Sequence, residues 1–228
     1  MRRPTPNAVV FDLGGVLIDW NPRHLYRRLI ADGDEMEGFL AEICPQSWNE
    51  RQDAGTPLAQ ATAERIDRFP GRAELIRAYY GRWEEMLGGP IAATVALLEA
   101  LHRRGIPLFA LTNWSAELFP IARRRFAFLE RFRGIVVSGE KGLIKPDPAI
   151  FVRLLARYRL DAASTLFIDD NPANVEAAAR LGFAALQYTD PFRLAGDLVS
   201  YGLIPNHDER ILPKPPRSLP RRPKITSS

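Results

Sequence analysis

The sequence predicts an α/β fold, in which a doubly wound, Rossmann-like parallel sheet is interrupted once by a block of helices. Short apolar runs alternate with helical patterns along most of the 228 residues, and continuously apolar runs are typical of strands covered on both faces. Between residues 20 and 89, helical patterns follow one another without a convincing strand. We therefore expect a core formed by 1–19 and 90–204, an inserted α-helical segment at 20–89, and a disordered, proline-rich basic tail at 205–228.

A charged residue directly follows the first predicted strand. Residues 8–11 are apolar, but the next residue is Asp12, which is followed closely by Gly14 and Gly15. A buried strand does not accommodate an unpaired carboxylate, whose desolvation costs several kcal/mol. Because glycines allow the backbone to approach a ligand closely, Asp12 is either a turn cap or a reactive group.

The helical insert has recognisable ends. Asn21 and Pro22 are typical of a helix start, as N-cap and first helical residue. At the other end, the segment 88–90 (Gly-Gly-Pro) closes the insert, and we expect its glycines to serve as a hinge.

After the insert, helices and strands alternate regularly. Asp147 and Asn171 are candidate N-caps, each followed by a proline at the first helical position. We expect helices at 91–104, 116–126, 148–158, 172–181 and 192–199, and strands at 107–111, 134–137, 165–168 and 183–186.

The composition is that of an ordinary globular protein, with 46% hydrophobic and 25% charged residues. The single cysteine, Cys44, excludes an internal disulfide and is expected to pack in a core. No uncharged apolar run is long enough to span a membrane, and Asp12 interrupts the N-terminal apolar run, which argues against a signal peptide. We therefore expect a cytoplasmic protein without a membrane partner.

The basic character is confined to the tail. The pI is about 9.4 and the net charge is +4, but residues 205–228 hold six Lys or Arg residues against Asp208 and Glu209. The globular part is therefore neutral overall and has no net attraction for polyanions, so we expect no nucleic-acid partner. The sequence leaves the oligomeric state open.

Polar residues follow four of the predicted strands. Because parallel strands present their carboxyl ends at one edge of the sheet, we expect these residues to converge in one crevice. Lys145 lies in the connection after a strand and is expected to reach the same place. The strand-end residues are Asp12, Thr112, Asn113, Ser138, Asp169 and Asp170.

These residue types suit a metal-assisted reaction on an anion. Three clustered carboxylates repel one another and need a cation, and oxygen ligands without His or Cys favour Mg²⁺ over Zn²⁺. The hydroxyl of Thr112 and the ammonium of Lys145 suit the oxygens of a phosphate. An aspartate facing the phosphorus could then attack it and form an aspartyl-phosphate that water hydrolyses.

Four segments in order resemble the motifs of the haloacid dehalogenase-like (HAD) hydrolase superfamily. They are 11–16 (Phe-Asp-Leu-Gly-Gly-Val), 111–113 (Leu-Thr-Asn), 145–146 (Lys-Pro) and 169–171 (Asp-Asp-Asn). The resemblance spans about residues 8–190, and the insert is similar to the family's small helical cap. It implies a phosphatase acting on a small phosphorylated metabolite, such as a sugar phosphate.

The resemblance also implies roles for individual residues. Asp12 would be the nucleophile, and Lys145 would balance charge on Asp12 and on the transferred group. Thr112, Lys145 and the backbone of Asn113 would bind that group. The implied Mg²⁺ ligands are Asp12, the carbonyl of Gly14, Asp169 and Asp170.

One position departs from the family pattern. Many family phosphatases carry a second Asp two positions after the nucleophile as general acid and base, but Gly14 stands there in this chain. Loss of general acid–base help typically costs about 10²–10⁴ in rate. Family dehalogenases also lack this Asp, so a metal-independent 2-haloacid dehalogenase is one alternative. The pair Asp169–Asp170 favours the phosphatase, since the family dehalogenases have a Ser-Asn pattern at these positions. The other alternative is a non-catalytic protein that binds a phosphorylated ligand.

Overall fold

The computed structural model describes residues 5–205, so all but the first residue of the tail predicted at 205–228 lies outside this range. Its centre is a five-stranded parallel sheet in the order β5-β4-β1-β6-β7. β1 lies in the middle, where Phe11 is in register with Ala110 on one side and Ile168 on the other. The strands are β1 (Ala8–Phe11), β4 (Leu108–Thr112), β5 (Gly134–Val137), β6 (Thr165–Asp169) and β7 (Ala184–Gln187).

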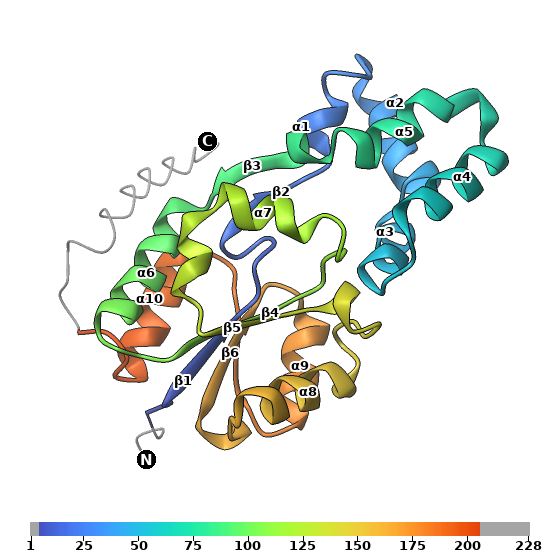
Figure 1. Cartoon of the computed structure of the whole chain (residues 1–228). Coiled ribbons are helices and arrows are strands. Elements are labelled where there is room, and N and C mark those ends of the chain that lie inside the picture. The colour runs from blue at the N-terminus through green and yellow to red at the C-terminus, as the bar shows by residue number, and fades with distance from the viewer. Residues whose placement is uncertain (1–4, 206–228) are drawn as a thin grey trace, which may run out of the picture.

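Helices cover both faces of this sheet, as the apolar strands require (Figure 1). Successive residues of β1 point to opposite faces: Val9 and Phe11 belong to one hydrophobic core, and Ala8 and Val10 to the other. The first core includes residues of α6 (Ala92–Arg103), α7 (Phe119–Arg125) and α10 (Pro191–Ser200). The second includes residues of α8 (Pro148–Tyr158) and α9 (Pro172–Arg180). The predicted doubly wound α/β fold is confirmed.

The predicted helix starts beneath the sheet edge are also present. The carboxylate of Asp147 accepts a hydrogen bond from Ala149 N at 2.8 Å, and the amide oxygen of Asn171 accepts one from Ala173 N at 2.9 Å. Such caps satisfy backbone N–H groups that have no partner within the helix. They fix where α8 and α9 begin, next to Lys145 and Asp170.

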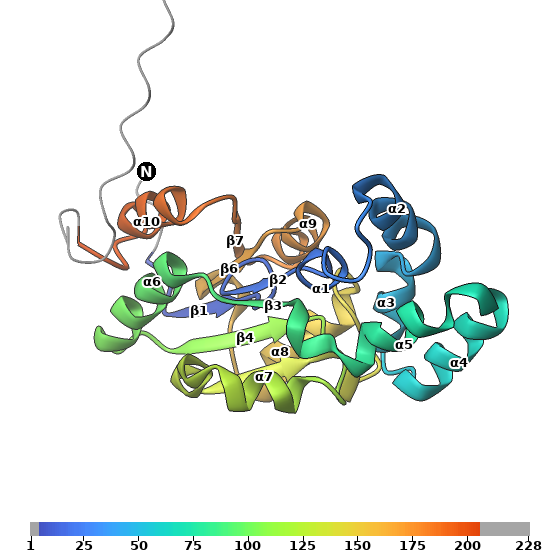
Figure 2. The same cartoon turned by 90° about the horizontal axis from the view of Figure 1, so that it is seen from above.

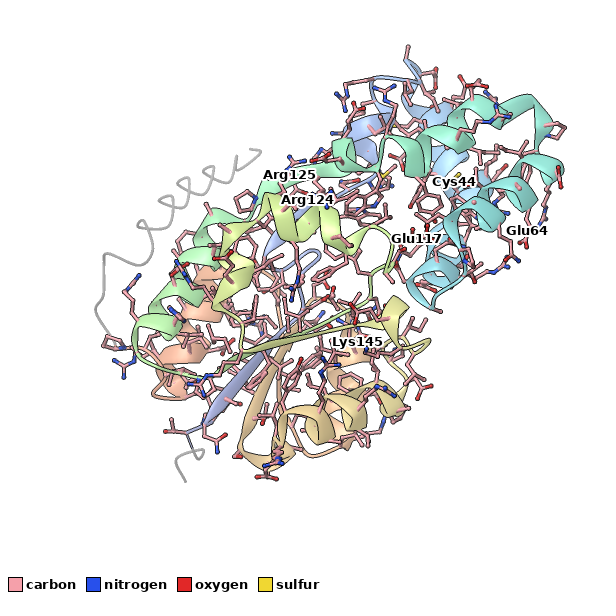
Figure 3. All side chains as sticks on the ribbon, in the orientation of Figure 1. Cys44, Glu64, Glu117, Arg124, Arg125 and Lys145 are labelled. Atoms are coloured by element: carbon pink, nitrogen blue, oxygen red, sulfur yellow. The ribbon has the colours of Figure 1, made fainter. Side chains whose placement is uncertain are left out.

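Residues 21–86 are largely helical, and this segment lies beyond one end of the sheet (Figures 1 and 2). Its own core contains an aromatic cluster in which Trp48 contacts Tyr79 and Tyr80, with ring centroids 5.1 and 5.2 Å apart. Cys44 is buried in this helical segment (Figure 3), where desolvation raises the pKa of its thiol to about 12. The helices are α1 (Arg23–Tyr26), α2 (Gly33–Gly38), α3 (Gln46–Asp53), α4 (Leu58–Arg68) and α5 (Ala73–Gly81), with a π-helical turn at Phe39–Ile43.

The junction between the sheet and the helical segment differs from the prediction. Residues 88–90, in a segment where no strand was predicted, belong to strand β3 (Leu87–Pro90), which pairs antiparallel with β2 (Ile18–Trp20). Glycine and proline are poor strand formers, so the sequence pattern conceals this two-stranded ribbon. A Cβ at Gly88 would lie 2.2 Å from Asp19 Oδ2 and 2.9 Å from His24 Nε2, so these two side chains would have to shift. Asp19 and His24 form an ion pair or hydrogen bond at 2.9 Å beside this ribbon.

Within residues 5–205, no helix is long and apolar enough to cross a membrane.

Candidate active site

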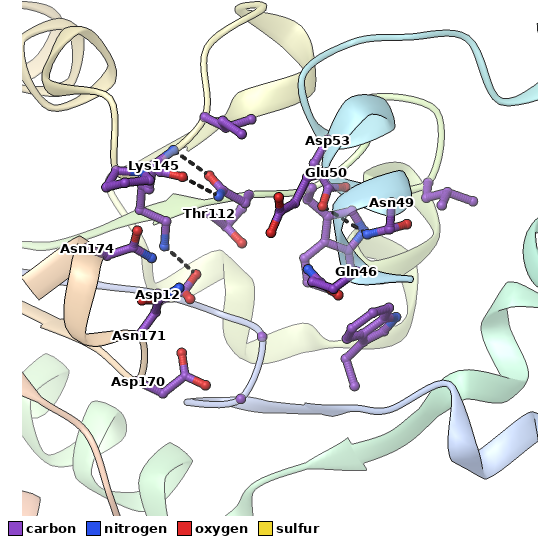
Figure 4. Close-up of a pocket in the computed structure, with 18 of the residues that line it drawn as sticks. Asp12, Gln46, Asn49, Glu50, Asp53, Thr112, Lys145, Asp170, Asn171 and Asn174 are labelled. Atoms are coloured by element: carbon purple, nitrogen blue, oxygen red, sulfur yellow. Dashed lines mark hydrogen bonds and ion pairs between the residues drawn. The ribbon is translucent and has the colours of Figure 1, made fainter. Parts of the chain in front are cut away.

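A pocket of about 480 Å³ opens at the carboxyl ends of β1, β4 and β6 (Figure 4). Asp12 follows β1 directly, Thr112 ends β4, and Asp170 follows β6. Lys145 reaches the same place from the loop that precedes α8. The predicted convergence of these strand ends is therefore present, because the parallel strands deliver their last residues to one edge.

Lys145 is the centre of the charged cluster. Its Nζ lies 2.9 Å from Asp12 Oδ1 and 2.6 Å from Asp169 Oδ2. The side chains of Lys145 and Asp169 are fully buried, and that of Asp12 is 11% exposed. Burial works to lower the pKa of Lys145, but the two carboxylates outweigh it and the pKa is raised. The lysine therefore stays charged between its two partners.

The carboxylates outnumber the ammonium. Carboxylate oxygens of Asp12, Asp169 and Asp170 all lie within 4.8 Å of one another. Burial raises the pKa of Asp12 to about 7; the charge of Lys145 opposes this rise, and Asp169 and Asp170 add to it. Burial and the charge of Asp169 likewise raise the pKa of Asp170. Such a site is stabilised by a cation, and its all-oxygen donors are those that Mg²⁺ prefers.

Two amide side chains hold the cluster in place. Asn174, in the first turn of α9, donates from Nδ2 to both oxygens of Asp169, at 3.0 and 3.1 Å. Asn113 forms two bonds with the backbone of Lys145: its Nδ2 donates to the carbonyl at 3.0 Å, and its Oδ1 accepts from the N–H at 2.8 Å. Asn174 was not predicted, and its only signal is its place in the first turn of α9.

The turn after Asp12 is shaped by Gly15 rather than by Gly14. Gly15 has a φ of 73°, and a Cβ on it would lie 2.4 Å from Asp170 Oδ2. At Gly14, a Cβ would meet nothing within 4 Å. The chain therefore has space for a side chain at position 14 but does not place one there. The Asp12 carboxylate itself is fixed by Leu13 N, which donates to Oδ1 at 2.7 Å.

Ser138 does not take part in the pocket, contrary to the expectation for its strand end. Its Oγ donates to the main-chain carbonyl of Asp53 at 2.6 Å and accepts from Trp114 N at 2.8 Å. This buried serine instead links the loops after β4 and β5 to helix α3. The pattern of strand ends gave no means of telling a linking serine from a ligand-facing one.

The opposite wall of the pocket comes largely from α3, whose contribution was not predicted. The polar residues of this wall recur at helical spacing, so that one face of α3 looks into the pocket. That spacing is the signal that could have revealed them. They are Gln46, Asn49, Glu50 and Asp53 (Figure 4).

Three tryptophans, Trp20, Trp83 and Trp114, complete the lining. Trp114 lies against Trp83, with ring centroids 5.4 Å apart, and against Phe119 at 5.8 Å. It therefore serves both in packing and in lining the pocket. The result is a cavity with a charged floor, one polar wall and several aromatic faces.

The sheet order and the carboxylates at its edge define an α/β enzyme that works at the carboxyl end of a parallel sheet. A model of the haloacid dehalogenase-like hydrolase family matches residues 6–182. The chain belongs to this family and is a hydrolase.

Two curated relatives match most of the chain. The sesquiterpene phosphatase astK of Aspergillus oryzae is 30% identical over 202 residues, which cover 82% of this chain and 91% of the relative. The N-acetylmuramic acid 6-phosphate phosphatase of Pseudomonas aeruginosa is 24% identical over 194 residues, with coverages of 82% and 84%.

Solved structures agree with the fold. A HAD-like family hydrolase from Porphyromonas gingivalis superposes with a TM-score of 0.68 at 26% identity, covering 86% of this chain and 98% of its own. A HAD family enzyme from Bacteroides thetaiotaomicron, in complex with magnesium and inorganic phosphate, has a TM-score of 0.62 at 23% identity, with coverages of 80% and 93%.

Proposed function

We propose that the chain is a Mg²⁺-dependent phosphatase that removes phosphate from a small phosphorylated metabolite through an aspartyl-phosphate on Asp12. The observation that carries the proposal is the cluster on the pocket floor, where Lys145 contacts both Asp12 and Asp169. Both curated relatives described above are named as phosphatases, which supports the same reaction.

Asp12 is placed to act as the nucleophile. It lines the pocket, its carboxylate is held by Leu13 N, and Lys145 keeps a positive charge beside it. A held carboxylate attacks with little loss of conformational freedom, and the nearby ammonium lowers the repulsion between two anions. The hydroxyl of Thr112, the backbone of Asn113 and Lys145 would bind the phosphoryl oxygens, since all three residues line the pocket.

The oxygen donors around Asp12 fit a hard divalent cation. Asp12, Asp169, Asp170 and the carbonyl of Gly14 would hold Mg²⁺, and within residues 5–205 the cluster contains no His or Cys that would favour zinc. When bound, the ion would offset the negative charge of the carboxylates and of the phosphate. The alternative dehalogenase reaction needs no metal ion, so the retained pair Asp169–Asp170 favours the phosphatase.

The leaving group is expected to be small and hydroxylated, as in a sugar phosphate. A cavity of about 480 Å³ suits a metabolite. Its tryptophans suit the apolar face of a ring, and the amides of Gln46 and Asn49 suit hydroxyl groups. The phosphosugar named for the Pseudomonas relative supports this class. Within the same proposal, the enzyme acts in the cytoplasm and needs no nucleic-acid or membrane partner.

Metal removal tests the proposed function. We expect the purified protein to hydrolyse p-nitrophenyl phosphate with Mg²⁺ and to lose at least about 10²-fold in rate in excess EDTA, because the clustered carboxylates then repel the substrate. Readdition of Mg²⁺ is expected to restore the rate. Release of chloride from 2-chloropropionate that survives EDTA would contradict the proposal and favour the dehalogenase. Phosphate binding without hydrolysis would favour the non-catalytic alternative.

A substitution at Gly15 tests the metal site more finely. In Gly15→Ala, the new methyl group would displace the Asp170 carboxylate, and the positive φ would cost about 1 kcal/mol in stability. Displacing a ligand in this way is expected to raise the Mg²⁺ concentration for half-maximal activity by about 10–100-fold. Gly14→Ala, which keeps the carbonyl and has open space, is expected to have the smaller effect. Equal effects of the two variants in a Mg²⁺ titration would count against this placement of the metal.

A further inference from the structure

We propose that Asp53, at the end of helix α3, gives a proton to the leaving group and then takes one from the attacking water. The assignment rests on the proposed phosphatase function. It fills the role for which Gly14 offers no side chain.

The geometry places the Asp53 carboxylate inside the pocket. Asp53 lines the same cavity as Asp12, from the opposite wall, and is only 7% exposed (Figure 4). Asn49 Nδ2 donates to Asp53 Oδ2 at 3.0 Å. The Tyr80 hydroxyl, 3.1 Å from Asn49 Oδ1, orients this amide so that its N–H group faces Asp53. A substrate bound at Asp12 on the pocket floor would therefore have its leaving oxygen toward the wall that carries Asp53.

The other carboxyl groups of the pocket are less suited to the task. Asp12 is the proposed nucleophile, and Asp170 lies in the acidic cluster beside it. Glu50 shares the α3 face but is only half-buried. Asp53 is buried, is held in position by Asn49, and lies on a different wall of the pocket from the Lys145 cluster.

The surroundings of Asp53 favour a carboxyl group that holds a proton near neutral pH. Burial raises its pKa to about 7; the charges of Glu50 and Asp12 add to the rise, and a backbone hydrogen bond from Ser115 opposes it. The hydroxyls of Tyr79 and Tyr80, which also lie near Asp53, have their own pKa values raised by burial and are neutral in this range. At neutral pH both forms of Asp53 are therefore populated, as a group that acts first as acid and then as base requires.

Asp53 is also tied to the loops of the sheet. The Ser138 hydroxyl donates to its carbonyl at 2.6 Å, and Ser115, which bonds its carboxylate, lies three residues after Thr112. A further hydrogen bond joins the helical segment to the loop after β4: Leu58 N donates to Glu117 Oε1 at 2.8 Å (Figure 3). The loop after β4, which would hold the phosphoryl group, therefore also positions Asp53. Asp53 itself belongs to helix α3.

The two steps balance. In the first, Asp12 attacks phosphorus, the bond from phosphorus to the leaving oxygen breaks, and that oxygen takes the proton of Asp53 to leave as an alcohol. In the second, the Asp53 carboxylate takes a proton from water as the water oxygen attacks the aspartyl-phosphate. The bond between phosphorus and Asp12 breaks, phosphate leaves, and both aspartates return to their starting forms.

The test compares two substrates that differ in their need for a proton. With Mg²⁺, Asp53→Asn is expected to lower kcat/KM for phenyl phosphate by about 10²-fold or more but to change that for 2,4-dinitrophenyl phosphate by less than about 3-fold, since only phenoxide is a poor leaving group. Because the second step also slows, 2,4-dinitrophenyl phosphate should give a burst of product. The decline of kcat/KM for phenyl phosphate above pH 7 should disappear in the variant.

Two variants serve as matched controls. Ser138→Ala loosens the contact to Asp53 without removing its carboxyl group, so any loss should show the same preference between the two substrates as in Asp53→Asn but be much smaller. Glu50→Gln neutralises the neighbouring carboxylate on the same helix face, and the difference between the two substrates should be much smaller there than in Asp53→Asn. Equal losses of both substrates in folded Asp53→Asn, or a substrate-dependent loss in Glu50→Gln alone, would overturn the assignment of Asp53. A wild-type protein that hydrolyses neither substrate would overturn the proposed function itself.

Discussion

Asp12→Asn is expected to lower phosphatase activity by about 10⁴-fold or more, the usual consequence of removing a nucleophile. Asparagine has nearly the same shape, and its amide oxygen can still accept from Leu13 N, so the pocket should keep its form. An amide does not form the acyl-phosphate bond, however. The expected result is a folded protein that incorporates no phosphate from a labelled substrate when quenched in acid.

A surface carboxylate provides the comparison for this variant. Asp34, exposed on α2, lies outside the pocket, and Asp34→Asn should retain both turnover and the acid-stable label. If Asp12→Asn still formed a phosphorylated enzyme at the wild-type rate, the nucleophile would have to be another residue.

Lys145→Met is expected to destabilise the fold by about 3–5 kcal/mol in EDTA at neutral pH, measured by urea unfolding. The reason is that Asp12 and Asp169 would then be buried without their ammonium partner, which lies 2.9 and 2.6 Å away. The loss should shrink as the pH falls below 7, because burial raises the pKa of Asp12 to about 7 and a protonated Asp12 needs no counter-charge. It should also shrink when Mg²⁺ is added, since the cation would take over part of the compensation.

Lys141, in the same loop, offers a control with the same change of side chain. It pairs at 3.2 Å with Glu140, and the two side chains are 15% and 47% exposed, whereas Lys145 and Asp169 are fully buried. Because Glu140 stays in contact with water when its partner is removed, Lys141→Met should cost less than about 1 kcal/mol. Similar losses in the two variants would show that the buried position of Lys145 has no special energetic role.

The sequence was sufficient for the sheet and for the floor of the site. Apolar strands that alternate with helices favour a buried parallel sheet, and parallel strands bring Asp12, Thr112 and Asp169 together at one edge. Lys145 was predicted to join them, and its contacts with Asp12 and Asp169 bear this out. These features depend on local pattern and on chain topology, both of which a single sequence contains.

The remaining features depend on packing between distant segments. The helical spacing of the polar residues around Asp53 indicates a shared face of α3, but that this face looks toward Asp12 depends on the contacts to Ser115 and Ser138. The ribbon of β2 and β3 was concealed because its glycines and proline suit a turn, whereas its pairing joins residues about 70 positions apart. The buried role of Ser138 was missed for the same reason.

The pairing of β2 with β3 has a consequence for how this architecture can vary. The chain leaves the sheet and returns to it at adjacent points, with Trp20 in register with Leu87. All the residues between these two points can therefore lengthen, shorten or change while the ladder of β1, β4 and β6 keeps its register. The pocket floor, which carries Asp12 and Lys145, and the wall formed by α3 are in this way free to evolve at different rates. A laboratory exchange of one wall for another would have two fixed and neighbouring splice points.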